Sequence, residues 1–250
     1  MYQNIIVDLG GVVVDYAPRE FLVDHFLNEK LENKLYDITF GSNEWMMMDS
    51  GELTREEGNA IMREKGIALG CKYEVDTILA DWFDMLHTRD DTVQLLKKLR
   101  KRGYSLFYLS NIPPDVLEIL QQRNFWKLFN GGIASCEVKL NKPDPRIFTM
   151  LLQKYDLTAN ECIFIDDNKT NAAAAFEANI TGVHFRNIRL LARTLVGYGV
   201  HIEKKAAAIS PHVPAPDTKN KTRRWFHRRF FHSCSLMRES ALFSSRLTCA

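Results

Sequence analysis

Three short apolar runs, each followed by an acidic or hydroxyl side chain, constrain the fold of this chain more than any other feature of its sequence. The runs are Asn4–Val7, Ser105–Leu109 and Cys162–Ile165, and the residues that follow them are Asp8, Ser110 and Asp166. Near-continuous apolar runs of this length are typical of strands that are covered on both faces, as in a parallel sheet. The sequence therefore predicts a buried parallel β-sheet with polar residues at one edge.

Helical patterns separate these strands. We predict helices over Asp91–Arg102, Val116–Arg123, Asp144–Tyr155 and Asn171–Ala178, and weaker strands over Gly132–Ser135 and Gly182–Phe185. The first helix places Val93, Leu96 and Leu99 on one face. Alternation of strands and helices implies the α/β class, with a doubly wound parallel sheet.

The interval between Asp15 and Arg89 is too long for a simple connection between a strand and a helix. Helical spacing recurs in it at Phe21, Leu22, His25 and Phe26, in Thr54–Glu64, which begins with a Thr-x-x-Glu capping box, and in Val75–Leu86. We therefore expect an inserted helical cap. Trp45 and Met48 are expected to pack inside it rather than to meet a substrate, although either role fits the sequence.

These patterns divide the chain into three parts. We expect an α/β core over residues 1–15 and 89–199, a helical cap over 16–88, and a basic, disordered tail over 200–250. Residues 201–250 carry ten Lys and Arg against three Asp and Glu, and contain a proline-rich linker. The cations and aromatic residues of Arg223–Phe231 would suit a nucleic acid or a membrane, but their irregular spacing fits an extension without a partner better.

Composition excludes several classes of protein. The longest stretch without Asp, Glu, Lys or Arg is the twelve residues Gly103–Pro114, which is too short to cross a bilayer. Met1–Asn4 lacks the basic segment of a secretory signal, and the five cysteines include no Cys-x-x-Cys and do not suit a disulfide scaffold. We expect a cytoplasmic protein without a membrane span or a nucleic-acid partner.

Residues that follow parallel strands meet in a crevice beyond the carboxyl ends of the strands. The sequence places there Asp8, Ser110, Asn111, Asp166 and Asp167. Lys142 is added to this set because the prolines of the loop Lys139–Pro145 could aim its amine into the crevice.

This set of side chains suits phosphoryl transfer. A carboxylate can attack phosphorus and form an aspartyl-phosphate, paired carboxylates can hold Mg²⁺, and hydroxyl, amide and ammonium groups can bind the remaining phosphoryl oxygens. Gly10 and Gly11 permit a tight turn that brings backbone groups against a phosphate. The groups expected to bind a small phosphorylated metabolite are Gly10, Gly11, Ser110, Asn111 and Lys142.

Four segments, in chain order, resemble the motifs of the haloacid dehalogenase-like (HAD) hydrolase superfamily. They are Asp8-Leu-Gly-Gly-Val-Val, Leu109-Ser110-Asn111, Lys142-Pro-Asp-Pro and Phe164-Ile-Asp-Asp-Asn168. The resemblance implies Asp8 as the catalytic nucleophile, and Ser110 and Lys142 as catalytic groups on the phosphoryl oxygens. It also implies an Mg²⁺ site formed by Asp8, the backbone carbonyl of Gly10, Asp166 and Asp167.

Position 10 departs from the superfamily's pattern. Its phosphatases usually carry a second Asp two residues after the nucleophile as general acid and base, and here that residue is Gly10, while Asp15 is too far along the chain to replace it. General acid catalysis is worth about 10² to 10⁴ in rate. The Asp-Leu-Gly-Gly-Val form nevertheless resembles a branch that includes sugar-phosphate phosphatases such as α-glucose-1-phosphate phosphatase, so a sugar phosphate is one candidate substrate.

The sequence predicts an Mg²⁺-dependent phosphatase that acts on a small phosphorylated metabolite. One alternative is a dehalogenase in which Asp8 displaces halide from carbon, a reaction that needs no metal. A phospho-acceptor signalling domain uses similar side chains, but there the acid pair precedes the acceptor. Because Gly10 lacks a proton donor, a protein that binds a phosphorylated ligand without turnover also stays open.

Overall fold

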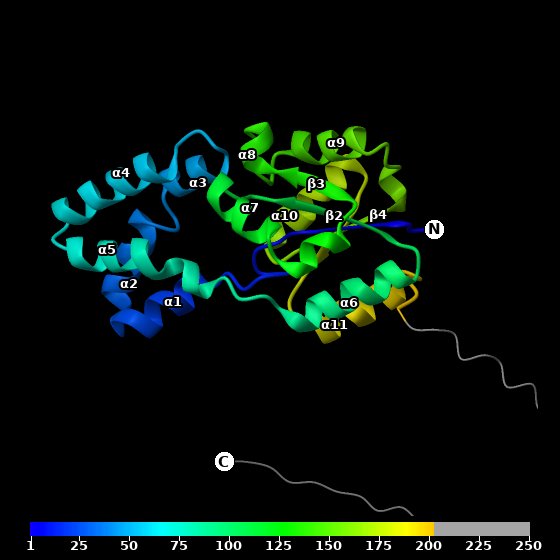
Figure 1. Ribbon diagram of the computed structural model, residues 1–250, viewed down its shortest axis with the longest axis horizontal. Coiled ribbons are helices and arrows are strands. Elements are labelled where there is room, and N and C mark those ends of the chain that lie inside the picture. Colours follow the sequence, from blue (N-terminus) through cyan, green and yellow to red (C-terminus); the bar gives the residue numbers. More distant parts are fainter. Residues whose placement is uncertain (203–250) are drawn as a thin grey trace, which may run out of the picture. The chain divides into compact units, whose positions relative to one another are not determined.

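The computed structural model describes residues 1–202 and contains a five-stranded sheet in the order β3-β2-β1-β4-β5 (Figure 1). The strands are β1 (Asn4–Val7), β2 (Ser105–Ser110), β3 (Gly131–Ala134), β4 (Cys162–Asp166) and β5 (Thr181–His184). Each neighbouring pair is parallel. The predicted α/β class and the doubly wound parallel sheet are confirmed.

Alternate residues of the central strands pack into two different hydrophobic clusters. On β1, Ile5 and Val7 belong to one cluster and Ile6 belongs to the other. The first cluster contains side chains of α6 (Asp90–Lys101), α7 (Pro114–Gln121) and α11 (Ile188–Gly197), and the second contains side chains of α9 (Pro145–Lys154) and the 3-10 helix η4 (Ala175–Ala178). Helices therefore cover both faces of the sheet, which explains why its strands are apolar along their whole length.

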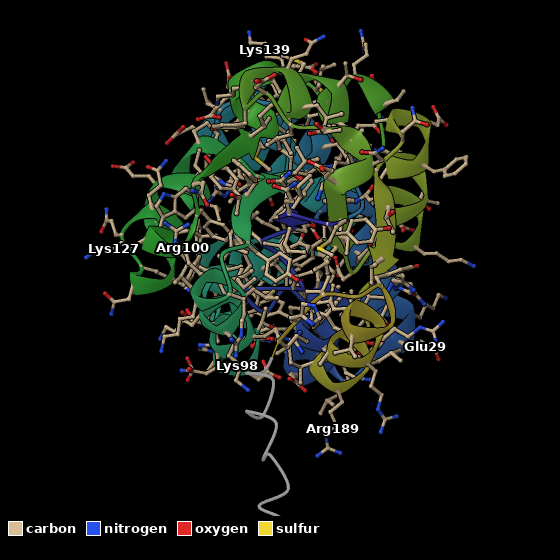
Figure 2. All side chains as sticks on the ribbon, turned by 90° about the vertical axis from the view of Figure 1, so that its right-hand side faces the viewer. Glu29, Lys98, Arg100, Lys127, Lys139 and Arg189 are labelled. Atoms are coloured by element: carbon tan, nitrogen blue, oxygen red, sulfur yellow. The ribbon has the colours of Figure 1, made fainter. Side chains whose placement is uncertain are left out.

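The helix predicted over 91–102 runs from Asp90 to Lys101, and its apolar face is buried as expected. Lys98 and Arg100 of this helix project outward from the ribbon (Figure 2). The helix predicted over 171–178 begins earlier, at Lys169, because the side chain of Asn168 caps it by accepting a hydrogen bond from the Thr170 amide at 2.8 Å. This helix, α10 (Lys169–Ala174), then tightens into η4.

Five α-helices occupy the chain between β1 and α6, on the side of the sheet drawn at the left of Figure 1. They are α1 (Pro18–Phe26), α2 (Glu29–Ile38), α3 (Asn43–Asp49), α4 (Arg55–Ala68) and α5 (Lys72–Asp81), followed by the 3-10 helix η1 (Trp82–Met85). The Thr54–Glu57 capping box forms at the start of α4. Trp45 packs edge-on against Trp82 with ring centroids 4.9 Å apart, so aromatic contacts hold α3 against the end of α5.

Short connecting elements complete the fold: η2 (Asn124–Leu128), α8 (Ser135–Val138) and η3 (Ala159–Glu161). None of the helices described in residues 1–202 is long and apolar enough to cross a membrane. The expected basic tail lies, from residue 203 onward, outside the residues that the structure describes.

Candidate active site

The carboxyl ends of the central strands form one wall of a cavity of about 220 Å³. In the register of the sheet, Val7 of β1 lies beside Ile165 of β4, so Asp8 and Asp166 follow at the same level on neighbouring strands. Polar lining comes from Asp8, Ser110, Asn111, Asp167, Asn168, Asn171, Tyr16 and Asp49, and Gly10 also lines the cavity. The side chains predicted from the strand ends therefore converge in space.

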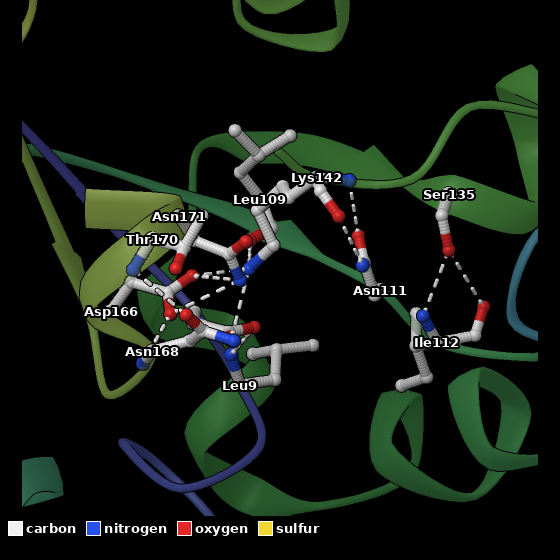
Figure 3. A network of polar contacts seen from close by, with 11 residues as sticks. Leu9, Leu109, Asn111, Ile112, Ser135, Lys142, Asp166, Asn168, Thr170 and Asn171 are labelled. Carbon is white, nitrogen blue, oxygen red and sulfur yellow. Dashed lines mark hydrogen bonds and ion pairs between the residues drawn. The ribbon is translucent and has the colours of Figure 1, made fainter. Parts of the chain in front are cut away.

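Lys142 brings one positive charge into this cluster from the loop before α9. Its ammonium group is fully buried and lies 2.9 Å from Asp8 Oδ2 and 2.6 Å from Asp166 Oδ2. It also donates a hydrogen bond to the backbone carbonyl of Leu109 at 2.9 Å (Figure 3). A buried ammonium with two carboxylates and a carbonyl around it has all three of its donors satisfied.

Asn111 holds the loop that carries Lys142. Its side-chain oxygen accepts a hydrogen bond from the Lys142 amide at 2.8 Å, and its side-chain nitrogen donates to the Lys142 carbonyl at 3.0 Å (Figure 3). The end of β2 is thereby tied to the loop before α9. Asn111 was predicted to bind substrate, and these two bonds give its side chain a second, positioning role.

Asp166 is the most enclosed acid of the cluster, and protein donors surround it. Its Oδ1 accepts hydrogen bonds from the Asn168 amide at 2.7 Å and from Asn171 Nδ2 at 3.3 Å, while its Oδ2 faces Lys142. Asp166 does not line the cavity, whereas Asp8 and Asp167 do. Among the three acids predicted to bind a metal, Asp8 and Asp167 are thus the two that face the open space.

The two glycines after Asp8 have different conformations. Gly11 has a φ of +68°, and a Cβ atom there would overlap the carboxylate of Asp167. Gly10 has no left-handed backbone, and a Cβ atom there would meet Tyr16 at an ordinary contact distance of 3.6 Å. The turn therefore requires glycine at position 11, while position 10 has room for a side chain.

The donor set fits a hard divalent cation. Asp8, Asp166 and Asp167 each offer a carboxylate oxygen, and these atoms lie within 4.8 Å of one another. Lys142 offsets one of the three negative charges, so the cluster keeps two that a divalent ion would balance. Oxygen-only ligands of this kind are those that Mg²⁺ prefers.

Burial and crowding of like charges control protonation in the cluster. Burial, together with the nearby Asp166 and Asp167, raises the pKa of Asp8 to about 7, although Lys142 acts in the opposite direction. Burial lowers the pKa of Lys142, but attraction to Asp8 and Asp166 outweighs it, and the net shift is upward. Lys142 thus stays positively charged at neutral pH.

The segment between β1 and α6 also lines the cavity, and the sequence left open whether Trp45 in this segment would do so. Trp45, Asp49 and Tyr16 line it together with Trp82 and Leu86, while Met48 is buried among the helices as expected. Trp45 is 5% exposed and both packs in the cap and faces the cavity. Trp45 and Asp49 stand four positions apart on α3, which places them on one helix face and is the signal that could have identified the pair.

The two histidines nearest to the ends of the insertion, His25 and His87, lie away from this cavity. His25 packs on Phe21, with ring centroids 4.0 Å apart, and its Nδ1 is 2.8 Å from the Phe21 carbonyl. His87 lines a second, more open hollow together with Asp15, which lies 3.5 Å from Arg89. Neither histidine lines the cavity that holds Asp8.

Residues 2–179 match the family of haloacid dehalogenase-like hydrolases. The chain belongs to this family. The family predicted from the four motifs is thereby confirmed, and with it the assignment of the chain to a class of hydrolases.

Known relatives of this HAD-family hydrolase include a phosphatase. A sesquiterpene phosphatase of Aspergillus oryzae is 25% identical over 185 residues, which cover 73% of this chain and 89% of the relative. Two longer relatives are covered over only 34% and 17% of their own length.

Solved structures show the same fold. A HAD family enzyme of Bacteroides thetaiotaomicron, crystallised with magnesium and inorganic phosphate, aligns with a TM-score of 0.57 at 24% identity, over 74% of this chain and 95% of the enzyme. An L-2-haloacid dehalogenase aligns with a TM-score of 0.60 at 19% identity, over 78% of this chain and 99% of the enzyme.

Proposed function

We propose that this HAD-family hydrolase is an Mg²⁺-dependent phosphatase that hydrolyses the monoester of a small phosphorylated metabolite through an aspartyl-phosphate on Asp8. The observation that carries the proposal is the group of three carboxylates around the buried ammonium of Lys142 at the end of the cavity. Carboxylate oxygens offered to a cation, beside a fixed ammonium group, suit the binding of a phosphoryl group.

The geometry supports the following roles. Asp8 Oδ1 accepts a hydrogen bond from the Leu9 amide at 2.7 Å, and Oδ2 faces Lys142, so the carboxylate is held at the base of the cavity. Its attack on phosphorus breaks the bond to the leaving-group oxygen, and water then cleaves the aspartyl-phosphate to release inorganic phosphate and regenerate Asp8. Ser110 lines the cavity and would donate a hydrogen bond to a phosphoryl oxygen, and the Lys142 ammonium beside Asp8 would add positive charge next to the phosphoryl group.

Asp8, Asp167 and the backbone carbonyl of Gly10 would hold the Mg²⁺ ion, with Asp166 behind them. The ion would supply positive charge to the phosphoryl oxygens and reduce their repulsion of the attacking carboxylate. The phosphatase relative and the neighbour crystallised with magnesium and phosphate favour the same chemistry.

The cavity restricts the organic part of the substrate. At about 220 Å³ it is larger than the 150 Å³ cavity that accommodates one benzene, but smaller than a typical drug-sized pocket. Trp45, Trp82 and Leu86 give it apolar walls, and Asp49 and Asn111 add polar groups. A small phosphate monoester with one ring-sized group, including a sugar phosphate, fits these dimensions.

The experiment is a phosphate-release screen over sugar phosphates, nucleotides and phosphorylated acids with Mg²⁺. Asp8→Asn serves as the blank, because the amide has nearly the same shape but is a poor nucleophile. We expect turnover that chelation abolishes and that Asp8→Asn lacks.

Two rival functions predict different results in the same experiment. Halide release from 2-haloacids without metal would support a dehalogenase instead. Binding of phosphate esters without turnover would support a non-catalytic protein.

A further inference from the structure

The leaving-group oxygen of a phosphate ester needs a proton, and position 10 provides none. Gly10 stands where related phosphatases carry their acid, although the backbone there would accept a side chain. The cavity contains another carboxyl group outside the metal cluster, that of Asp49 at the end of α3. Asp49 is therefore the carboxyl group in the cavity, outside the metal cluster, that could supply this proton.

Two hydrogen bonds anchor α3 on the loops of the sheet edge. Asn141 Nδ2 donates to the Met46 carbonyl at 2.9 Å, and the Ser135 hydroxyl donates to the carbonyl of Asp49 itself. Asn141 precedes Lys142, and Ser135 Oγ also accepts from the Ile112 amide at 2.9 Å (Figure 3). The end of α3 that carries Asp49 is thereby fixed relative to the segments that follow β2 and β3.

The carboxylate of Asp49 is free to act. Within residues 1–202 it has no hydrogen-bond or ion-pair partner, although Arg55 lies on the adjoining helix. Arg55 is engaged elsewhere, because its Nε lies 2.9 Å from Asp115 Oδ2 and its guanidinium covers the ring of Trp82 at 4.9 Å. An acid that faces the cavity without a structural partner can donate to a ligand.

Burial favours the protonated form of Asp49, although the charged groups around it on balance favour the carboxylate. Burial is the main cause that raises the pKa of Asp49, to about 7, and the negative charge of Asp115 raises it further. Arg55, whose effect is larger than that of Asp115, and Lys142 lower the pKa. Tyr16 faces the same side chain, and its own pKa is raised by burial and by Asp49. A carboxyl group with a pKa close to neutrality can both give and take a proton at working pH.

We propose that Asp49 is the general acid and base of the reaction, supplied by the inserted helices in place of the carboxyl group absent at position 10. The inference rests on the proposed phosphatase activity. When Asp8 attacks phosphorus and the P–O bond breaks, the Asp49 carboxyl gives its proton to the departing oxygen and becomes a carboxylate. When water attacks the aspartyl-phosphate, this carboxylate takes the proton from the water, and inorganic phosphate and the original acid result.

The test compares two esters in wild type and Asp49→Asn. Benzyl phosphate has a strongly basic alkoxide leaving group that needs a proton, whereas p-nitrophenyl phosphate has a stable phenolate that does not. We expect kcat/KM, which reports only the step in which the leaving group departs, to fall by about 10² to 10³ for benzyl phosphate and by less than about tenfold for p-nitrophenyl phosphate. The alkaline decline of the wild-type benzyl phosphate rate should disappear in the variant.

Glu44→Gln is the matched control, because Glu44 lies on the same helix but pairs with Lys65, 2.5 Å away, outside the cavity. We expect it to leave both rates unchanged. Equal losses of kcat/KM on the two esters in a folded Asp49→Asn protein would overturn the role of Asp49 but leave the proposed function standing. A wild type that releases phosphate from neither ester would refute the proposed function itself.

Discussion

The buried ammonium of Lys142 offers a test of the site that does not depend on any substrate. Lys142→Met keeps the length and apolar stem of the side chain but removes the charge that faces Asp8 and Asp166. Both carboxylates would remain buried, with exposed side-chain fractions of 11% and 0%. Removing one partner of a buried ion pair costs about 3 to 5 kcal/mol, because the other charge loses its compensation.

We expect the free energy of unfolding of Lys142→Met to fall by about 3 kcal/mol or more in metal-free buffer at pH 7.5, measured by urea denaturation. The pKa of Lys142 in the folded protein lies above its value of 10.5 in the unfolded chain, so the ammonium is charged in both states between pH 7 and 9. Titration of Lys142 should therefore not change the loss of unfolding free energy within this pH range. Mg²⁺ should stabilise the variant more than the wild type, since the variant has one more negative charge to balance.

Lys154→Met is the matched control. Lys154 donates only to the Gly132 carbonyl, at 3.2 Å, and stands in no ion pair among the described residues. We expect its removal to cost less than about 1 kcal/mol. A loss below about 1 kcal/mol for Lys142→Met as well would refute the argument that its charge compensates the buried acids.

Three further changes test the turn, the acid and the anchor of α3. Gly11→Ala should cost about 1 to 3 kcal/mol in unfolding free energy and lower phosphate release, because its φ is left-handed and its Cβ would overlap Asp167, whereas Gly10→Ala should be tolerated. As pH rises from about 4 to about 7, Asp49→Asn should become more stable relative to wild type by about 3 kcal/mol, because the folded wild type keeps a proton on Asp49 that the unfolded chain has lost; a pH-independent difference in urea titrations would contradict the raised pKa. Ser135→Ala should lower the free energy of unfolding by about 1 to 2 kcal/mol, because the Asp49 carbonyl and the Ile112 amide each lose a hydrogen-bond partner. It should also lower kcat for benzyl phosphate by a larger factor than it changes KM.

The part of the site built on the sheet could be predicted because local patterns determine it. A parallel strand that is apolar along its length places the next residue at the carboxyl edge, and this rule alone brings Asp8 and Asp166 to one level. Lys142 was harder to place, since its approach depends on the two hydrogen bonds of Asn111 across the loop. Those bonds join residues 31 positions apart, a distance that no local pattern reports.

The wall contributed by the inserted helices could not be predicted in the same way. Helical periodicity separates buried from exposed faces, but it does not tell whether a buried side chain meets another helix or a cavity. Trp45 does both, because its ring packs on Trp82 while its side chain lines the cavity. The helices over 29–38 and 43–49 were not predicted as separate elements, so the position of Asp49 at the end of α3 was not predicted either.

The placement of the proton donor on α3 has a consequence for how the site is assembled. Asp8, Asp166 and Asp167 stand at the sheet edge, but Asp49 reaches the cavity only while α3 is docked on Ser135 and Asn141. A carboxyl at position 10 would instead be present whether or not the inserted helices are docked, and neither a left-handed backbone nor a clash at Cβ opposes the substitution of Gly10. Gly10→Asp in the Asp49→Asn background should therefore restore turnover of benzyl phosphate and make it insensitive to Ser135→Ala. Recovery that still required Ser135 would show that docking of α3 serves the cavity walls rather than the delivery of a proton.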